Sequence, residues 1–296
     1  MALESVTTCP ICKGNNFEPF NQCIDFTTSK EEFIIITCKA CHFLITSPRP
    51  DSNSIGKYYQ SENYISHTNS SKNLIDKLYI TVRAFTLQWK LNLIQSHKPN
   101  GKILDYGCGT GEFLNICKTA NWGCAGVEPA MAARKKASKL TNLNIAGSLD
   151  QIDHSKFDVI TLWHVLEHIE NLNEKLSELK SCLTEGGIIF IAVPNHESLD
   201  AKIYKSYWAG YDVPRHLWHF SQSTMNRLLT SHGLTLLKTI PMKQDSFYVS
   251  LLSEKYLNPK ANILIHAIKA FAIGLRSNLA AKRNRNYSSL VYIAKV

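Results

Sequence analysis

The chain alternates short apolar runs with longer segments in which apolar side chains recur every three or four residues. The apolar runs have the length of buried strands and cover residues 103–106, 122–128, 143–146, 157–162 and 188–193. Helical segments lie between them, after residue 111 and at residues 130–140 and 172–183. Strands that alternate with amphipathic helices form a doubly wound, mostly parallel sheet. We therefore predict an α/β fold for the central part of the chain.

Two further helices are predicted on either side of this alternation. Residues 72–95 carry an apolar stripe at helical spacing, which we expect to contact the core; its members are Leu74, Leu78, Val82, Phe85 and Trp89. Residues 261–281 are rich in Ile, Leu, Ala and Phe and precede a last predicted strand at residues 290–294.

Positive charge is concentrated near the C-terminal end. The net charge is +9, and residues 255–296 contain eight Lys or Arg and no acid. A basic amphipathic helix of this kind can dock on an anionic membrane, cover a pocket or form a dimer contact. We favour a packed lid with solvated basic ends, keep peripheral membrane contact as the alternative, and leave the oligomeric state open.

The N-terminal sequence shows no signal pattern, and we expect no apolar run of membrane-spanning length. The predicted location is therefore the cytoplasm, with association at the inner face of the membrane as a further possibility. In that reducing compartment, nine cysteines argue against a disulfide framework.

Four of the cysteines form two C-x-x-C pairs, Cys9 with Cys12 and Cys38 with Cys41. Four thiolates complete a tetrahedral structural zinc site, so these pairs predict a small N-terminal zinc ribbon. The segment from Cys9 to Cys41 has three lysines and four acids. A nucleic-acid binder would show a basic patch there, so we expect a structural or substrate-side role and no nucleic-acid partner.

The most informative motif joins the first strand of the alternation to the helix that follows. Asp105 precedes three glycines at alternate positions, Gly107, Gly109 and Gly111. Glycine permits the sharp turn and lets a ligand approach the backbone, and the next helix offers free amide donors. A dinucleotide fold has G-x-G-x-x-G instead and holds a pyrophosphate. A carboxylate at Asp105 would repel a pyrophosphate but suits a cationic amino group.

This segment resembles motif I of the class I S-adenosylmethionine (SAM)-dependent methyltransferases. The strand that ends in Glu128, the FDVI strand at 157–160 and the GG pair before 188–193 extend the resemblance from about residue 101 to 195. It implies a seven-stranded SAM-methyltransferase sheet with an antiparallel final strand, and a ribose-binding role for Glu128. The cofactor-binding residues that it implies are Asp105, Gly107, Cys108, Gly109, Gly111, Glu128, Pro129, Leu149 and Trp163.

The same resemblance suggests four segments along the chain. Residues 1–62 would form the zinc ribbon and a connector, and residues 63–100 a helical cover. Residues 101–241 would form the SAM-binding core, and residues 242–296 a basic amphipathic helical insertion with the final strand.

The segment after the FDVI strand contains the string H-x-x-E-H, formed by His164, Glu167 and His168. Zinc peptidases carry this string within a helix, whereas here it follows a parallel strand, so we reject a peptidase. The segment is similar to the E-x-x-E-H sequence of ubiquinone-biosynthesis O-methyltransferases, which can hold a divalent ion. His164 replaces their first glutamate and departs from that pattern. Otherwise Trp163 and His164 would line the methyl-donor pocket, while Glu167 and His168 would position the helix.

Residues 207–221 combine aromatic side chains with two histidines and Arg215. The run PRHLWHFS within them resembles a broad bacterial methyltransferase group that has a zinc-binding N-terminus and diverse acceptors. Histidine is the usual base near neutral pH, so His216 and His219 are candidate catalytic residues, with His164 behind them. A structural imidazole is the alternative for each. Arg215 would pair with an acceptor anion or with Asp212.

The resemblance as a whole implies a SAM-dependent methyltransferase with structural zinc. The expected acceptor is a small molecule, a glycan precursor or a lipid-linked molecule beneath the 207–220 loop, with O-methylation favoured over C-methylation. The alternatives are an rRNA or tRNA methyltransferase and a catalytically inactive SAM-fold binding module.

Overall fold

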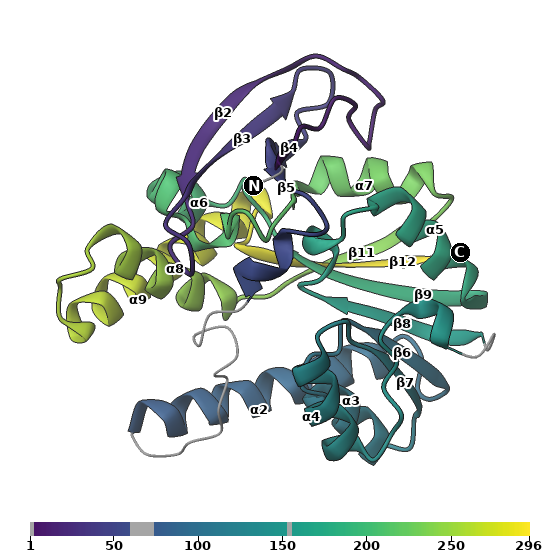
Figure 1. The fold of residues 1–296 in the computed structure, drawn as a ribbon. Helices are drawn as coiled ribbons and strands as arrows, with labels where there is room; N and C mark the ends of the chain where they lie inside the picture. Colours follow the sequence, from purple (N-terminus) through teal and green to yellow (C-terminus); the bar gives the residue numbers. More distant parts are fainter. Residues whose placement is uncertain (1–2, 60–73, 153–155) are drawn as a thin grey trace. The chain divides into compact units, whose positions relative to one another are not determined.

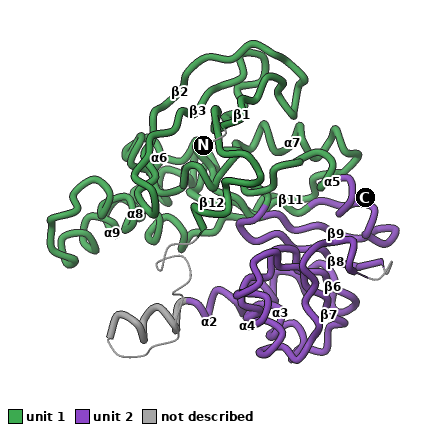
Figure 2. Tube along the Cα trace, in the orientation of Figure 1, with its two compact units in different colours: residues 1–66, 166–175, 192–293 green, residues 67–165, 176–191, 294–296 purple. Residues whose placement is uncertain are grey.

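A computed structural model describes residues 3–59, 74–152 and 156–296 (Figure 1). The chain forms two compact units (Figure 2). Unit 1 comprises residues 1–66, 166–175 and 192–293, and unit 2 comprises residues 67–165, 176–191 and 294–296. Neither unit is continuous in sequence. The division into four segments stays a prediction.

The central sheet has six strands in the order β11-β12-β9-β8-β6-β7. Its strands are β6 (Lys102–Tyr106), β7 (Gly123–Val127), β8 (Phe157–Trp163), β9 (Leu183–Pro194), β11 (Thr235–Pro241) and β12 (Ser289–Lys295). β6 pairs in parallel with both β7 and β8. The helices that alternate with these strands are α3 (Glu112–Thr119), α4 (Met131–Thr141) and α5 (Leu172–Ser181). The α/β fold and its mostly parallel sheet are confirmed.

The final strand runs antiparallel to its neighbour, as expected. Asn195 N–H donates to Ser288 O at 2.8 Å, and Val296 N–H donates to Gly187 O at 3.4 Å. The partner therefore moves backwards along β9 as the chain advances along β12, which defines an antiparallel pair.

The prediction of a strand at residues 143–146, which would have given the central sheet seven strands, is wrong: the described part of this sheet has six. The segment makes one isolated parallel bridge, between Val127 and Ala146. It begins after Asn142, which has a left-handed conformation with φ of 53°, and Gly147 follows it. Two residues that favour turns leave too short an extended run for a ladder.

The long helix before the sheet is present as α2 (Leu74–Gln95). Of the predicted apolar stripe, the side chains of Leu74, Leu78 and Val82 lie outside the described residues. Phe85 is 62% exposed, so the expectation that it contacts the core is wrong.

Unit 1 contains a four-stranded sheet in the order β10-β4-β3-β2. Its strands are β2 (Phe17–Ile24), β3 (Glu32–Cys38), β4 (Leu44–Thr46) and β10 (Trp218–His219). A second pair joins β1 (Leu3–Glu4) to β5 (Arg49–Pro50). The first sheet shares a core with the loop after β9: Cys23, Phe33 and Ile35 lie in one buried cluster with Trp208, Tyr211 and Val213.

The remaining elements among the described residues of unit 1 are short 3₁₀ helices and four α-helices. They are η1 (Ile55–Tyr59), η3 (Leu166–His168), α6 (Leu199–Tyr204), η4 (Lys205–Tyr207), η5 (Ala209–Tyr211), α7 (Gln222–Ser231), α8 (Asp245–Leu257) and α9 (Ile263–Asn284). α7 begins at a Ser221–Thr224 capping box. By length and composition alone, α9 could cross a membrane, so the expectation that no apolar run reaches that length is wrong.

Candidate active site

The four cysteines of the two C-x-x-C pairs converge in unit 1. Their sulfur atoms lie within 4.8 Å of one another, and the Cys9–Cys41 and Cys12–Cys38 pairs are each 3.5 Å apart. Tetrahedral zinc with bonds of about 2.3 Å separates its sulfur ligands by about 3.8 Å. The four thiolates therefore fit a structural zinc ion. All four sulfur ligands belong to the protein, so such an ion has no open position for a substrate.

The zinc-ribbon sheet holds the histidine-rich loop. β10, which belongs to the PRHLWHFS run, pairs antiparallel with β4, so Trp218 lies opposite Ile45 and His219 opposite Leu44. Thr46 Oγ1 also donates to the backbone oxygen of His216 at 2.7 Å. The ribbon is thus part of the scaffold that positions the candidate bases.

The glycine loop of unit 2 has the backbone that its sequence requires. Gly107, Gly109 and Gly111 have φ values of 75°, 56° and 85°, which disfavour other residues. A Cβ at Gly107 would lie 2.5 Å from Val165, and one at Gly111 would lie 2.9 Å from Ala137. A Cβ at Gly109 would meet no atom within 4 Å among the described residues. The loop therefore packs at its two ends and leaves its middle open to a ligand.

Two acidic side chains flank this loop. Asp105 is buried and accepts a hydrogen bond from Thr161 Oγ1 at 2.7 Å. Burial raises the pKa of Asp105 to about 7, although Thr161 and Lys90 act in the opposite direction. Glu128 accepts from the N–H groups of Gly109 at 2.8 Å and Ala130 at 2.9 Å. A cationic ligand group beside Asp105 would favour its charged form, and Glu128 keeps lone pairs for ribose hydroxyls.

The other predicted cofactor residues also belong to unit 2. Trp163 lies edge-on to Phe113 at 5.5 Å, and Lys90 Nζ lies 4.4 Å from the centre of one Trp163 ring. Leu149 is half-buried at the start of η2 (Leu149–Gln151). The remaining members are Cys108, which is buried, and Pro129, which is exposed. His164, the third candidate base, also belongs to unit 2 and has a left-handed φ of 57°. These positions are compatible with the predicted SAM site.

A second cluster lies in unit 1 around His216. The imidazole Nδ1 of His216 lies 2.9 Å from Gly210 O, and since a carbonyl only accepts, Nδ1 carries the proton. His216 Nε2 therefore holds a lone pair in the neutral ring. This atom lies 4.0 Å from carboxylate oxygens of both Glu167 and Asp212.

His168 completes this cluster. Its ring lies edge-on to His216 at 4.6 Å, and its Nδ1 contacts Arg215 O at 3.0 Å and Tyr59 Oη at 3.1 Å. Burial and the neighbouring His216 lower the pKa of His168 to about 4, so its ring is neutral at pH 7. Glu167, His168 and His216 each offer a ligand atom within 4.8 Å of the others, which also suits a divalent cation. His164 does not belong to this group.

His219 has a different environment from His216. It is 4% exposed, and its Nε2 lies 2.9 Å from Thr46 Oγ1, whose own proton goes to His216 O. His219 Nε2 must therefore be the donor. Burial lowers the pKa of His219 well below its usual value. This arrangement favours a structural role for His219 in the β4–β10 junction.

Arg215 is 1% exposed and is held by two carboxylates. Its guanidinium donates to both oxygens of Asp212, at 2.9 and 2.6 Å, and to Asp25 at 2.9 Å. It also donates to Tyr58 O at 3.0 Å. Burial opposes ionisation of both acids, but hydrogen bonds, including those from Arg215, hold the pKa of each below its usual value. The expected pairing of Arg215 with Asp212 is present, and its pairing with an acceptor anion stays a prediction.

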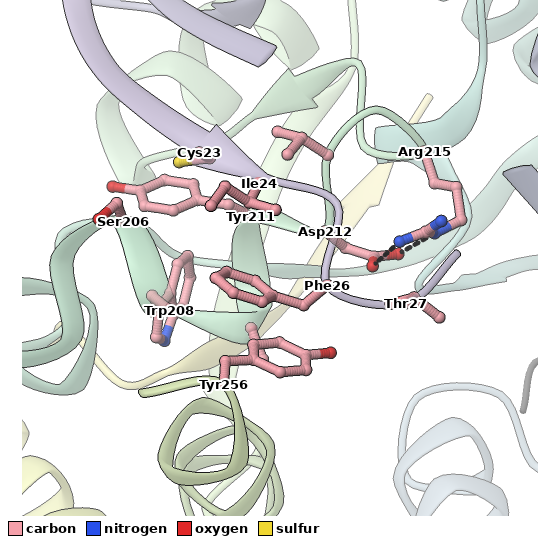
Figure 3. Close-up of a pocket in the computed structure, with 12 residues that line it drawn as sticks. Cys23, Ile24, Phe26, Thr27, Ser206, Trp208, Tyr211, Asp212, Arg215 and Tyr256 are labelled. Atoms are coloured by element: carbon pink, nitrogen blue, oxygen red, sulfur yellow. Dashed lines mark hydrogen bonds and ion pairs between the residues drawn. The ribbon is translucent and has the colours of Figure 1, made fainter. Parts of the chain in front are cut away.

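Most aromatic side chains of the 207–220 loop are used in packing. Trp208, Tyr211, Trp218 and Phe220 are each at most 4% exposed. The cavity beside the loop (Figure 3) is about 10 Å³, which is room for about one water molecule. Phe26 stacks on Tyr256 there at 4.6 Å. This cavity is too small for an acceptor.

A larger hollow of about 470 Å³, a volume typical of small-molecule sites, also lies in unit 1 and shares Tyr211 of the loop with the small cavity. Its lining residues are Phe20, Asn21, His196, Glu197, Ala201, Lys202, Lys205 and Tyr211. His216 is not among them, so the hollow and the candidate base do not coincide among the described residues.

The sequence pattern placed Glu167 and His168 in a string that can hold a divalent ion or gave them a role in positioning the helix, but it did not place them beside His216. The signal was present, because an acid and a histidine follow the end of a parallel strand, where open α/β sheets place their ligands. Their proximity to His216 depends on a contact between residues almost fifty positions apart. No local pattern predicts such a contact.

Comparisons with known proteins identify the family and the fold of the chain. Residues 80–239 match a family model described as a methyltransferase domain. An indolepyruvate C-methyltransferase from Streptomyces griseus is 25% identical over 183 residues, which are 55% of this chain and 54% of that protein. A ubiquinone biosynthesis O-methyltransferase from Glaesserella parasuis serovar 5 is 31% identical over 116 residues, 33% of this chain and 49% of that protein.

The chain thus spans about half the length of these curated relatives. Among solved structures, magnesium protoporphyrin IX methyltransferase from Synechocystis PCC 6803 with bound SAH has a TM-score of 0.53 at 14% identity. The match covers 83% of this chain and 99% of that one. This likeness shows a shared fold.

Proposed function

The chain belongs to the methyltransferase-domain family, and we propose on that basis that the protein transfers the methyl group of SAM to a hydroxyl group of a small-molecule, glycan-precursor or lipid-linked acceptor. The single observation that carries the proposal is the open glycine loop between Asp105 and Glu128. The carboxylates of Asp105 and Glu128 suit a ligand that has a cationic amino group near the first and ribose hydroxyls near the second.

The residues of unit 2 would hold the cofactor without taking part in bond changes. Asp105 would attract the amino group, Gly109 would allow close approach, and Glu128 would accept from the ribose hydroxyls. When bound, SAM supplies an activated sulfonium methyl group. The protein then needs mainly to orient the acceptor and to remove its proton.

We propose His216 as the general base. Its Nδ1–H is fixed on Gly210 O, so its Nε2 is free to take the acceptor's hydroxyl proton. The resulting imidazolium would gain its counter-charge from Glu167 and Asp212, each 4.0 Å from Nε2. His168 would stay neutral beside it because burial and His216 both disfavour its protonation.

A divalent cation is the second possibility at the same place. The ligand atoms of Glu167, His168 and His216 are close enough for two imidazoles and one carboxylate to hold one ion. The backbone carbonyls at Nδ1 of both histidines resemble the supporting contacts of metal-bound imidazoles. A bound cation would lower the pKa of an acceptor hydroxyl. Chelator treatment that leaves the four-cysteine zinc in place, checked by a zinc content of one ion per chain, distinguishes the two, because only the cation mechanism then loses activity and regains it with added divalent metal.

The preference for oxygen over carbon is also a proposal. The relatives include one named for C-methylation and one for O-methylation. A lone imidazole readily removes a hydroxyl proton during transfer, whereas a carbon acceptor needs prior stabilisation of its carbanion. The near-neutral charge of the zinc ribbon supports a small acceptor over RNA.

The test uses purified protein and SAM that carries a ¹³C- and ³H-labelled methyl group. A cell extract is separated into small-molecule, lipid and RNA fractions, and each is incubated with the enzyme. We expect label in the small-molecule or lipid fraction and an O-methyl carbon signal in the product. Label in RNA alone would contradict the proposed acceptor, and absence of SAM binding by calorimetry would support the inactive binding module instead.

A further inference from the structure

Helix α9 presents a row of large apolar side chains to solvent. Leu264, Ile268, Phe271, Leu275 and Leu279 are between 42% and 70% exposed. Successive spacings of four, three, four and four residues place them on one side of the helix. With Ile263 and Ile265, α9 carries seven of the nineteen exposed large apolar residues in the described chain. We call the five-residue set the apolar row.

The opposite side of α9 is fixed to the rest of unit 1. His266, Ala270, Gly274, Ser277 and Ala281 are buried. A Cβ at Gly274 would lie 2.7 Å from Phe247 of α8, and Ser277 Oγ donates to Asp200 of α6 at 2.6 Å. Small residues on this side let α9 pack closely. The helix is therefore held along its length with the apolar row facing outwards.

A row of basic side chains runs beside the apolar row. Lys269, Arg276 and Arg283 are exposed and recur every seven residues, so they share one face next to the apolar side chains. Lys269 Nζ lies 3.9 Å from Glu254 of α8. Residues 255–296 contain no acid at all. An apolar stripe flanked by basic residues is the pattern of helices that lie in a membrane interface.

We infer that the apolar row and basic row of α9 bind the surface of an anionic lipid membrane, with the helix lying in the interfacial plane. Spanning is disfavoured because one face of α9 is bound to α6 and α8 through polar contacts. A second copy of the chain fits less well. Antiparallel self-association through the apolar row would bring two basic rows together without an acid on the helix to neutralise them, and parallel self-association would leave both rows without a counter-charge. Anionic head groups supply that missing charge.

The inference does not depend on the proposed methyl transfer, because none of the residues assigned to catalysis or cofactor binding lies on α9. If both hold, the membrane would bring the enzyme to amphiphilic acceptors.

The test is co-sedimentation of the full chain with vesicles of phosphatidylcholine alone or mixed with phosphatidylglycerol. We expect binding to the mixed vesicles, weakened by salt. Lys269→Glu/Arg276→Glu should weaken it at least about 30-fold, from the loss of two surface charges. Leu264→Ser/Ile268→Ser should weaken it at least about 100-fold, from the loss of two buried apolar side chains.

Matched controls come from exposed positions on α4. Lys135→Glu/Lys136→Glu makes the same charge change, and Met131→Ser/Leu140→Ser removes two apolar side chains that are 60% and 46% exposed. Both control proteins should bind vesicles like the wild type. Circular dichroism melting checks that each variant is folded. The salt dependence of the wild type tests the inference even where a variant is unstable.

Three results would overturn the inference. The first is no sedimentation of the wild type with phosphatidylglycerol vesicles. The second is equal loss of binding in the α9 and α4 variants. The third is a wild-type dimer in light scattering that Leu264→Ser/Ile268→Ser dissociates, while neither protein binds vesicles. This result would assign the apolar row to a contact between two copies of the chain.

Discussion

The affinity for SAM should depend on pH through Asp105. Burial raises the pKa of this carboxyl to about 7 in the free protein, so part of the population is protonated near neutral pH. A ligand ammonium group needs the carboxylate, and the apparent dissociation constant is the intrinsic one divided by the ionised fraction. That fraction falls from about one half at pH 7 to about one thirtieth at pH 5.5, which weakens binding about 16-fold. Because the pKa of Asp105 is raised, the affinity for SAM is lost as pH falls.

Isothermal titration of SAM between pH 5.5 and pH 7 measures this effect, because the ligand's α-amino group stays protonated over that range. Asp105→Asn should bind more weakly and with little pH dependence. The 2.7 Å hydrogen bond from Thr161 favours the charged form of the Asp105 carboxylate. Thr161→Val removes this bond and should therefore move the midpoint of the SAM-binding pH profile to higher pH. A constant wild-type affinity, or an unchanged pH slope in Asp105→Asn, would refute the reasoning.

Three further predictions concern the scaffold of unit 1. Cys41→Ser should lower the zinc content from one ion per chain and lower the melting temperature, while SAM binding persists. Elemental analysis and calorimetry measure these effects, and unchanged melting of a metal-free preparation would contradict the prediction. Arg215→Met removes the charge partner of the buried Asp25 and should cost about 3–5 kcal/mol of unfolding free energy, with partial recovery in the Arg215→Met/Asp25→Asn double variant. A loss below about 1 kcal/mol in urea unfolding would contradict this prediction. His219→Asn should lower stability by about 1–3 kcal/mol through the lost bond to Thr46 but change kcat little, and a large kcat loss at full stability would restore His219 as a catalytic candidate.

Local sequence pattern predicted the features that depend on neighbouring residues. The glycine loop needs positive φ at three alternate positions, and glycine reveals this need directly. The two C-x-x-C pairs bring two thiolates together within each turn, so only the approach of the pairs remained to be established. Alternating apolar runs likewise predicted the parallel pairing of β6, β7 and β8.

Contacts between distant residues could not be predicted in this way. β10 is two residues long and joins a strand more than 170 positions away, which makes His216 and His219 part of the ribbon scaffold. Arg215 meets Asp25 at a separation of 190 residues. The exposed row of α9 shows the converse case. Its apolar composition favoured a packed lid, and only the small residues on its other face establish which side is buried.

The central claim is that His216 removes the acceptor proton in a SAM-dependent transfer. Its most direct test is the rate of labelled methyl transfer by His216→Asn, measured beside SAM affinity and melting temperature. Asparagine can keep the hydrogen bond to Gly210 O but cannot act as a base. We predict that kcat falls about a hundredfold or more while SAM affinity and melting stay close to wild type. Full transfer activity in His216→Asn would contradict the claim.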